Sequence, residues 1–271
     1  MNIDLSGQVA IVTGGAMGIG EACSRKIALS RASVVILDQN EPEGSRTAAD
    51  IREGGGDCDF FHCDVSRSDQ VERCIREIVS KHGRIDILIS NAGIQYYGDV
   101  ITTPEAEWDR VIGVNLKGCY LVSKFAVPHM LGRNGAIVVL GSVQSFTAIQ
   151  NSAAYVTSKH AVLGLARAMA LDYAQKGIRV NCVCPGTIDT PMLHWAASLA
   201  PDPDSVIRTC DRMHALGRIG RPEEVANAVL YLASPAASFI TGAALLVDGG
   251  MLVPAGGMGF QEGGTGTATH K

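Results

Sequence analysis

Tyr155 and Lys159 stand four residues apart in the sequence, a spacing that places two side chains on the same face of a helix. A tyrosine is protonated in neutral water, but a neighbouring ammonium group favours its phenolate. Inside a cleft, a phenolate can take the proton of an alcohol. Ser142, thirteen residues before Tyr155, has a hydroxyl that can hydrogen-bond the same oxygen. This chemistry requires a cleft, and the surrounding elements must build it.

Short apolar strands alternate with helical segments along the whole chain. Strands are predicted at 8–13, 33–37, 58–62, 85–89, 136–140, 178–183 and 243–247. Helices are predicted between them at 19–31, 42–53, 68–82, 104–131, 153–175 and 222–233. Because the strands are uniformly apolar rather than alternating, both faces of the sheet must be buried. The pattern predicts a Rossmann-like, doubly wound α/β fold with a seven-stranded parallel sheet and helices on both faces.

No linker divides this repeat, so residues 1–255 are expected to form a single domain. Residues 187–217 depart from the pattern, because this segment is long, contains several prolines and includes Trp195. Long connections of this kind are often functional, and we expect a lid over the cleft. Residues 256–271 are rich in glycine and threonine. Disorder is the favoured interpretation of this tail, and docking on a neighbouring subunit is the alternative.

Composition excludes several classes of function. The chain of 271 residues has a net charge of −4 and a pI near 6.0, and it has no run of lysine or arginine. These values argue against nucleic acid or a membrane surface as partner. No apolar run is long enough to cross a bilayer, and the polar N-terminus does not resemble a signal peptide. We therefore expect a cytoplasmic protein.

The eight cysteines are scattered and form no C-x-x-C pair. Metal sites and disulfide frameworks require tighter clustering or a secreted context. We expect buried free thiols, and no metal site.

The first predicted strand ends at a glycine-rich turn, Thr13-Gly14-Gly15-Ala16-Met17-Gly18-Ile19-Gly20. Glycine permits the tight turn and lets backbone N–H groups approach a pyrophosphate at the start of the next helix. Asp38 stands where the second strand ends. A carboxylate there accepts hydrogen bonds from the adenosine ribose and repels a 2′-phosphate. No basic residue stands nearby, so the sequence predicts NAD rather than NADP, with an ordinary turn aspartate as the alternative interpretation.

Together these motifs resemble the short-chain dehydrogenase/reductase family over essentially the whole chain. The matching pieces are Thr13-Gly14-x-x-x-Gly18-x-Gly20, Asp64-Val65, Asn91-Ala92-Gly93, Asn115, Ser142, Tyr155-x-x-x-Lys159, Pro185-Gly186 and Asp248-Gly249-Gly250. Ser90 is a minor departure, because many members have an asparagine there. The resemblance implies that NAD is held by Gly14, Met17, Gly18, Ile19, Gly20, Asp38, Asp64, Val65, Asn91, Ala92, Gly93, Tyr155, Lys159, Pro185, Gly186, Ile188 and Thr190.

The resemblance also implies a division of roles within that set. Asp64 and Val65 would contact the adenine, and the segment Asn91-Ala92-Gly93 would line the cofactor. The nicotinamide end would be held by Pro185, Gly186, Ile188 and Thr190.

In the family, the positions of Asn115, Ser142, Tyr155 and Lys159 form a catalytic tetrad. Tyr155 would take the substrate hydroxyl proton while hydride leaves the carbinol carbon, and Ser142 would steady the charge on the oxygen. Lys159 would also bind the nicotinamide ribose, and Asn115 would position a water for proton release. Taken alone, Asn115 has a structural interpretation as a helix-kinking residue, Ser142 as a helix cap and Tyr155 as a core aromatic. The four together at family spacing favour the catalytic interpretation.

Residues expected to meet the substrate are mostly amides and aromatics: Gln95, Ser142, Gln144, Gln150, Asn151, His194 and Trp195. Amides both donate and accept hydrogen bonds, which suits a small-molecule sugar or polyol. Loose surface amides are an equally good interpretation of Gln150 and Asn151. A ketodeoxy sugar acid is the next choice, because Arg208 or Arg212 of the lid could pair with its carboxylate. A steroid-like or cyclic alcohol follows.

Two rival classes of function stay open at this stage. A 3-oxoacyl thioester reductase would fit NADPH and a basic carrier-binding patch, against which Asp38 and the net charge argue. A scaffold protein that lost its chemistry would be expected to show a gap in the tetrad, and the sequence shows none. Similar proteins pair their long helices across dimer faces, so the resemblance implies a homotetramer or a dimer.

Overall fold

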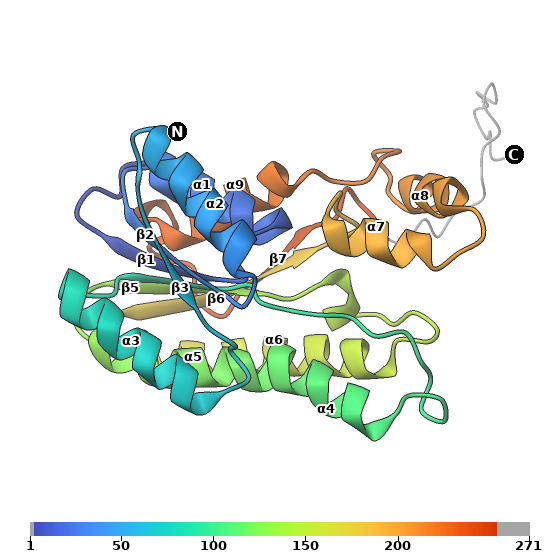
Figure 1. The fold of residues 1–271 in the computed structure, drawn as a ribbon, viewed down its shortest axis with the longest axis horizontal. Coiled ribbons are helices and arrows are strands. Elements are labelled where there is room, and N and C mark those ends of the chain that lie inside the picture. Colours follow the sequence, from blue (N-terminus) through green and yellow to red (C-terminus); the bar gives the residue numbers. More distant parts are fainter. Residues whose placement is uncertain (1–2, 254–271) are drawn as a thin grey trace, which may run out of the picture.

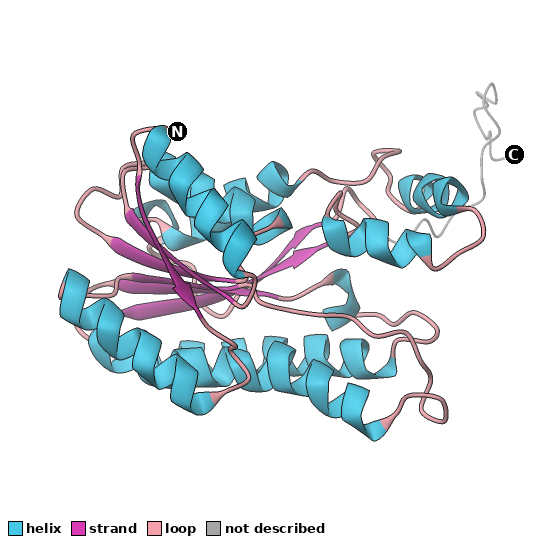
Figure 2. Ribbon diagram, in the orientation of Figure 1, coloured by secondary structure: helices cyan, strands magenta, loops and turns pink. Residues whose placement is uncertain are grey.

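A single seven-stranded parallel sheet forms the centre of the computed structural model, which describes residues 3–253 (Figures 1 and 2). Its strands are β1 (Val9–Thr13), β2 (Ser33–Asp38), β3 (Asp57–His62), β4 (Ile87–Ser90), β5 (Gly135–Leu140), β6 (Ile178–Pro185) and β7 (Ala244–Val247). They lie in the order β3-β2-β1-β4-β5-β6-β7, and every neighbouring pair is parallel. Every residue of β1 and β5 is buried, as uniformly apolar strands require. The predicted fold class is confirmed.

Helices cover both faces of the sheet in two layers (Figure 1). One layer contains α1 (Gly18–Leu29), α2 (Glu41–Glu53) and α9 (Pro222–Ala233). The other contains α3 (Ser68–His82), α4 (Glu105–Ile112), α5 (Gly118–Ala126) and α6 (Ala153–Tyr173). Each layer packs a separate apolar cluster against its own face of the sheet. The sheet is thus shielded from water on both sides, which fixes the ends of its strands as a rigid platform.

The strand order reverses at β1, whose neighbours are β2 on one side and β4 on the other. Thr13, the last residue of β1, pairs with Leu37 on one side and Ser90 on the other. The loops that follow these strands therefore start from one edge and diverge to opposite faces. A crevice opens at such a switch point, outside the carboxyl ends of the strands.

The helical region predicted at 104–131 is helical from Glu105 to His129 in the structure, but the type of helix changes along it. Between α4 and α5 the chain forms a π-turn, η1 (Gly113–Lys117), and α5 is followed by a 3₁₀ turn, η2 (Val127–His129). π-turns are rare and commonly occur at functional sites. Asn115 lies within this one, so the irregular turn coincides with a predicted catalytic residue.

The lid segment, residues 187–217, folds into two helices that project beyond the sheet (Figure 1). Thr190 caps α7 (Pro191–Ser198) and Asp202 caps α8 (Pro203–Arg212), and a proline begins each helix. Capping side chains satisfy backbone N–H groups that a short helix otherwise leaves unpaired. Both lid helices are therefore encoded locally, although the sequence pattern had indicated only a long connection.

Three further 3₁₀ turns complete the described chain: η3 (Val143–Ser145), η4 (Ala174–Lys176) and η5 (Pro235–Ala237). Among residues 3–253, no helix is both long enough and apolar enough to cross a membrane. The tail predicted at 256–271 lies outside the described residues, and the single-domain assignment stays a prediction.

Candidate active site

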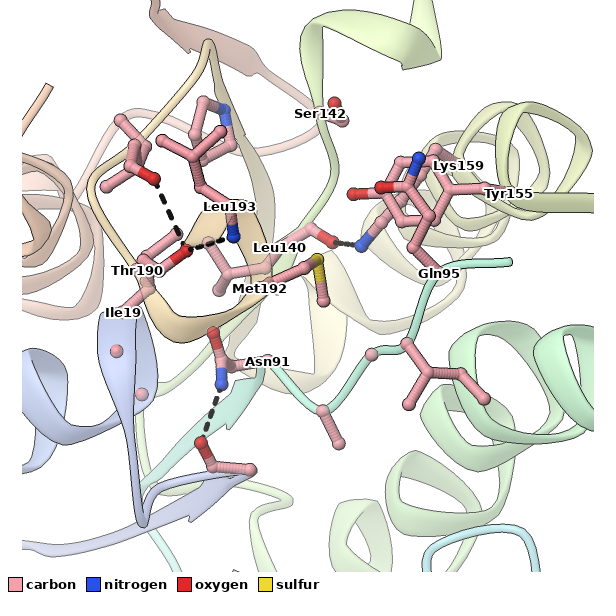
Figure 3. Close-up of a pocket in the computed structure, with 18 of the residues that line it drawn as sticks. Ile19, Asn91, Gln95, Leu140, Ser142, Tyr155, Lys159, Thr190, Met192 and Leu193 are labelled. Atoms are coloured by element: carbon pink, nitrogen blue, oxygen red, sulfur yellow. Dashed lines mark hydrogen bonds between the residues drawn. The ribbon is translucent and has the colours of Figure 1, made fainter. Parts of the chain in front are cut away.

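A cavity of about 570 Å³ lies at the carboxyl edge of the sheet, between the strand ends and the lid. All seventeen residues that the sequence assigned to the cofactor line this cavity. Ser142, Gln95 and Gln144 line it as well. In Figure 3, Gln95, Tyr155 and Lys159 gather on one side of the pocket, whereas Ile19, Asn91 and Thr190 lie on the other.

The glycine turn after β1 is packed too tightly for side chains. A Cβ on Gly14 would lie 2.8 Å from the Ala92 Cα, and one on Gly20 would lie 1.9 Å from the Gly14 carbonyl oxygen. Gly14 also has a φ of 61°, in the left-handed region. Two of these glycines are thus required by backbone packing.

Helix α1 begins at this turn with no side-chain cap, because its N-cap is Met17. The first turn of the helix, Gly18 to Gly20, lines the cavity. Uncapped N–H groups at a helix N-terminus favour a bound anion through hydrogen bonds and the helix dipole. The chemistry of this donor set fits the pyrophosphate of a dinucleotide.

Asp38 ends β2 and is held by the backbone around it. Its carboxylate accepts hydrogen bonds from Ala16 N (3.1 Å) and Asn40 N (2.9 Å). Lys159 is the one basic side chain among the cavity-lining residues of the described chain. The end of the cavity at β2 thus presents a carboxylate and no cation, which suits ribose hydroxyls rather than a phosphate.

Thr13 and Asn91 lock the two diverging loops together. The Asn91 amide donates to the carbonyls of Thr13 (3.0 Å) and Gly14 (2.9 Å), and the Thr13 hydroxyl accepts from the backbone N–H groups of Asn91 (3.0 Å) and Ala92 (3.1 Å). The crevice at the switch point is therefore preformed by hydrogen bonds within the protein.

Tyr155 and Lys159 share one face of α6, as their spacing predicted. The Lys159 side chain is buried, and its ammonium donates to the Leu140 carbonyl at 2.8 Å (Figure 3). The Lys159 Nζ lies 5.5 Å from the centroid of the Tyr155 ring. A fixed positive charge thus stands beside the phenol.

Ser142 follows β5 and caps the η3 turn. Its Oγ accepts from Gln144 N (3.1 Å), and its own N–H donates to the Ser145 Oγ (3.2 Å). The Ser145 hydroxyl in turn donates to the Lys159 carbonyl at 2.7 Å. This chain of hydrogen bonds attaches the Ser142 turn to the helix that carries Tyr155 and Lys159, so the three residues keep one geometry.

Asn115 lies behind the cavity rather than in its lining, and it is almost fully buried. Its Oδ1 accepts from Ile94 N (2.8 Å), and its Nδ2 donates to Ile94 O (3.0 Å) and Ser158 Oγ (3.0 Å). A Cβ on Gly93 would contact both the Asn115 Oδ1 (3.5 Å) and the Lys159 Nζ (3.7 Å). Asn115 therefore joins the loop after β4 to α6 directly behind the lysine.

The predicted substrate residues divide into lining and non-lining groups. Gln95 donates to the Ser152 Oγ at 3.3 Å, and the Oε1 atom of Gln144 is buried without a hydrogen-bond partner in the described chain. Gln150 and Asn151 are exposed, outside the cavity lining. Asn151 has a φ of 55°, and its carbonyl accepts from Gly98 N at 2.8 Å, a contact typical of a structural turn.

His194 and Trp195 are part of α7 but also lie outside the lining. The His194 Nε2 is 2.7 Å from the Asp189 Oδ1, on the exposed side of the lid. The Trp195 ring stacks on Tyr97, with 6.0 Å between centroids and 23° between planes. This stacked pair connects the lid to the loop after β4.

Sequence reasoning missed several residues that line the cavity: Tyr97, Ile149, Thr187, Met192, Leu193, Ala196, Cys210, Met213 and Met251. Burial raises the pKa of the Tyr97 phenol, and nearby Tyr155 and Cys210 add to this effect, so Tyr97 stays protonated. Burial likewise raises the pKa of the Cys210 thiol. All eight cysteines are free and seven are buried, as expected. Of the missed set, Tyr97 had a usable signal, because it stands two residues after Gln95 in a loop.

Comparisons with known proteins find relatives over most of the chain. The model of the family described as enoyl-(acyl carrier protein) reductase matches residues 14–252. Meso-2,3-butanediol dehydrogenase of Serratia marcescens is 38% identical over 237 residues, covering 87% of this chain and 91% of that protein. The 3-oxoacyl-[acyl-carrier-protein] reductase FabG of Thermotoga maritima is 36% identical over 242 residues, covering 89% of this chain and 96% of that protein. The ligand-free structure of Thermoplasma acidophilum aldohexose dehydrogenase superposes with a TM-score of 0.86 at 42% identity, covering 96% of this chain and 98% of that one.

Proposed function

This chain belongs to the short-chain dehydrogenase/reductase family of oxidoreductases, and we propose that it is an NAD-dependent dehydrogenase of a sugar or polyol. The reaction would oxidise a secondary alcohol or hemiacetal of a small polyhydroxylated substrate. The observation that carries this proposal is the placement of Tyr155, Lys159 and Ser142 in the same cavity as Asp38.

The spacing of the strands that end at the cavity supports this arrangement. Strands β2 and β5, which end at Asp38 and just before Ser142, stand three positions apart in the sheet. At the usual strand spacing, that separation is about 14 Å. A dinucleotide lying across the switch point would therefore have its adenosine ribose at Asp38 and its reactive ring near Tyr155.

The chain's own residues would handle the proton and the substrate oxygen. When bound, the nicotinamide accepts hydride from the carbinol carbon or returns it to the carbonyl. Tyr155 takes the hydroxyl proton during oxidation and donates one during reduction. The ammonium of Lys159 lies near the phenol that exchanges this proton, with its Nζ 5.5 Å from the centroid of the Tyr155 ring. Ser142 donates a hydrogen bond to the substrate oxygen as negative charge develops there.

Asn115 is proposed to support proton release. Its position between the Ile94 backbone and Ser158 holds the loop after β4 at a fixed distance from Lys159. A water held at this point would connect the lysine to solvent. The proton accepted by Tyr155 would then leave the cavity through Lys159 and that water.

Asp38 supports NAD over NADP. The carboxylate is fixed by two backbone N–H groups, and an NADP 2′-phosphate would meet its negative charge with no basic lining residue nearby. Members of the family use either NAD or NADP, so membership alone does not decide the cofactor. In this chain, Asp38 would decide it.

Two relatives favour a sugar or polyol, since their names specify a butanediol and an aldohexose. The lining amides Gln95 and Gln144 support the same class. Arg208 and Arg212, the two lid side chains considered as partners for a sugar-acid carboxylate, are absent from the lining. A 3-oxoacyl thioester reductase is the second candidate, because the family description and the FabG relative name acyl-carrier substrates.

We also propose a cytoplasmic homotetramer or dimer. Apolar residues are exposed at and near the outermost strand β7, where Phe239 is fully exposed and Leu245 and Leu246 are 37% and 40% exposed. A second copy packed on this edge would remove them from water. Light scattering that reports a monomer would contradict this assembly.

The test of the proposed activity is NADH formation with a panel of neutral sugars, polyols and cyclic alcohols, run beside NADPH consumption with a 3-oxoacyl thioester. We expect activity with NAD and at least one polyhydroxylated compound. Activity with the thioester and NADPH alone would favour the second candidate. A protein that binds NAD but turns over neither group would contradict both.

A further inference from the structure

His214 is a buried histidine just after α8, with 4% of its surface exposed, and it does not line the cavity. Its Nδ1 lies 2.7 Å from the Cys210 carbonyl oxygen, and its Nε2 lies 3.1 Å from the Thr187 backbone nitrogen. A carbonyl can only accept a hydrogen bond, and a backbone N–H can only donate one. The ring is therefore neutral, with its hydrogen on Nδ1 and a lone pair on Nε2.

The imidazole lies between two glycines at the ends of neighbouring strands. A Cβ on Gly186, after β6, would lie 2.7 Å from the His214 Nε2, and a Cβ on Gly249, after β7, would contact the ring at 3.5 Å. Gly249 also has a φ of 56°, which disfavours other residues. These glycines let one side chain pack against both strand ends and the lid.

Backbone pairing explains why Thr187 requires this partner. The carbonyl of Thr187 accepts from Gly220 N (2.9 Å), and Asp189 N donates to the Gly220 carbonyl (2.9 Å). The Thr187 N–H points the other way and reaches His214. An N–H buried without an acceptor is costly, so removing the imidazole would free this loop to rearrange.

Both hydrogen-bond partners of His214 line the cavity, on different elements. Thr187 belongs to the loop 186–190, and Cys210 belongs to α8 of the lid. This loop contains Gly186, Ile188 and Thr190, the residues proposed to hold the nicotinamide end. The histidine therefore fixes the distance between the nicotinamide loop and the lid.

We propose that His214 is a positioning residue for the nicotinamide end of the cofactor, a role that rests on the proposed function. It acts through the backbone of Thr187 and Cys210. The adenosine end, at Asp38 and the α1 N-terminus, has no contact with it. His214 variants should therefore discriminate between ligands with and without the nicotinamide ring.

The test compares NAD with ADP-ribose, which lacks nicotinamide, by calorimetric titration of the purified protein. His214→Leu removes both hydrogen bonds. We expect this variant to bind NAD about tenfold more weakly than wild type, the equivalent of about one lost hydrogen bond. Its affinity for ADP-ribose should stay within about twofold of wild type. His214→Gln can offer its Oε1 to the Thr187 N–H and should recover most of the NAD affinity. His129→Leu, at an exposed histidine that ends η2 outside the cavity lining, is the matched control and should change neither affinity.

Equal losses for both ligands, or no loss for NAD, would overturn the role of His214. If His214→Leu does not fold, His214→Asn provides the same comparison, because it keeps a donor for Cys210 and loses the acceptor for Thr187. A wild-type protein that binds ADP-ribose and NAD equally weakly would instead contradict the proposed function, and this inference with it.

Discussion

The two ends of the cavity, to which we propose that the adenosine and the substrate bind, are built from different structural elements. The adenosine end consists of strand termini, a glycine turn and an uncapped helix start, with Asp38 held by backbone N–H groups. The substrate end consists of side chains from the lid and two loops, among them Gln144, Tyr97 and Met213. Backbone at the end of a covered sheet has little freedom, whereas a short lid helix has few contacts to restrain it.

This difference suggests a division of labour between the two ends. A rigid backbone site suits a ligand that the whole family shares. A surface of exchangeable side chains can change substrate without disturbing the sheet. Tyr155 and Lys159 lie at the boundary, on a long helix that belongs to the scaffold. Mutations in the two regions should therefore separate cofactor binding, chemistry and substrate recognition.

The largest effect is expected at the boundary itself. Tyr155→Phe removes the proton acceptor and keeps the ring, so kcat should fall by about 10³-fold or more, near the upper range for general acid–base catalysis. NAD affinity should stay within about twofold of wild type, because the cofactor site is otherwise intact. Steady-state kinetics and calorimetry measure the two quantities. Near-wild-type kcat would remove Tyr155 from the mechanism.

At the adenosine end, Asp38→Ala should change cofactor choice without changing chemistry. The variant loses a carboxylate that accepts hydrogen bonds from the ribose and repels a 2′-phosphate. We therefore expect the ratio of kcat/KM with NAD to kcat/KM with NADP to fall by about 10- to 100-fold. The variant Asp57→Ala, on an exposed strand start, is the matched control. A ratio that is unchanged in Asp38→Ala would show that specificity arises elsewhere in the cavity.

At the substrate end, Gln144→Leu should raise KM for a polyol by up to about tenfold, the equivalent of one lost hydrogen bond. The unpaired Oε1 atom of Gln144 is the structural reason, since a substrate hydroxyl can supply its missing donor. Gln150→Leu, outside the lining, is the control and should have no effect. Equal effects of the two substitutions would mean that the lining does not define the substrate site.

The smallest effect is expected where the lid contacts the loop after β4. Trp195→Ala removes the stack on Tyr97, an interaction of about 0.5–1.5 kcal/mol. KM for the substrate should rise a few-fold while NAD affinity is unchanged, and Leu199→Ala on the exposed lid surface should match wild type. If Trp195→Ala weakened NAD affinity more than it raised KM for the substrate, the stack would belong to the cofactor site and not to the substrate site.

The two ends also differ in how far the sequence predicts them. Apolar strands, the glycine turn and Asp38 have local patterns, so the fold class and the residues around the adenosine end were predictable. The lid helices were not predicted, although their caps Thr190 and Asp202 are local signals. The packing of the lid against a distant loop, such as the stack of Trp195 on Tyr97, has no local pattern. His214 had no sequence signal, since its role arises only where β6, β7 and α8 meet. The π-turn at Asn115 was likewise hidden within a continuous helical pattern.

The central claim is that hydride passes from a neutral alcohol to NAD in the cavity shared by Asp38 and Tyr155. The most direct measurement supplies a carbinol-deuterated polyol, chosen from the active members of the panel, with equimolar NAD and NADP. Mass spectrometry then follows the label. We predict that deuterium appears in reduced NAD, with little in reduced NADP and none with Tyr155→Phe. Deuterium mainly in reduced NADP, or in neither cofactor, would contradict the account.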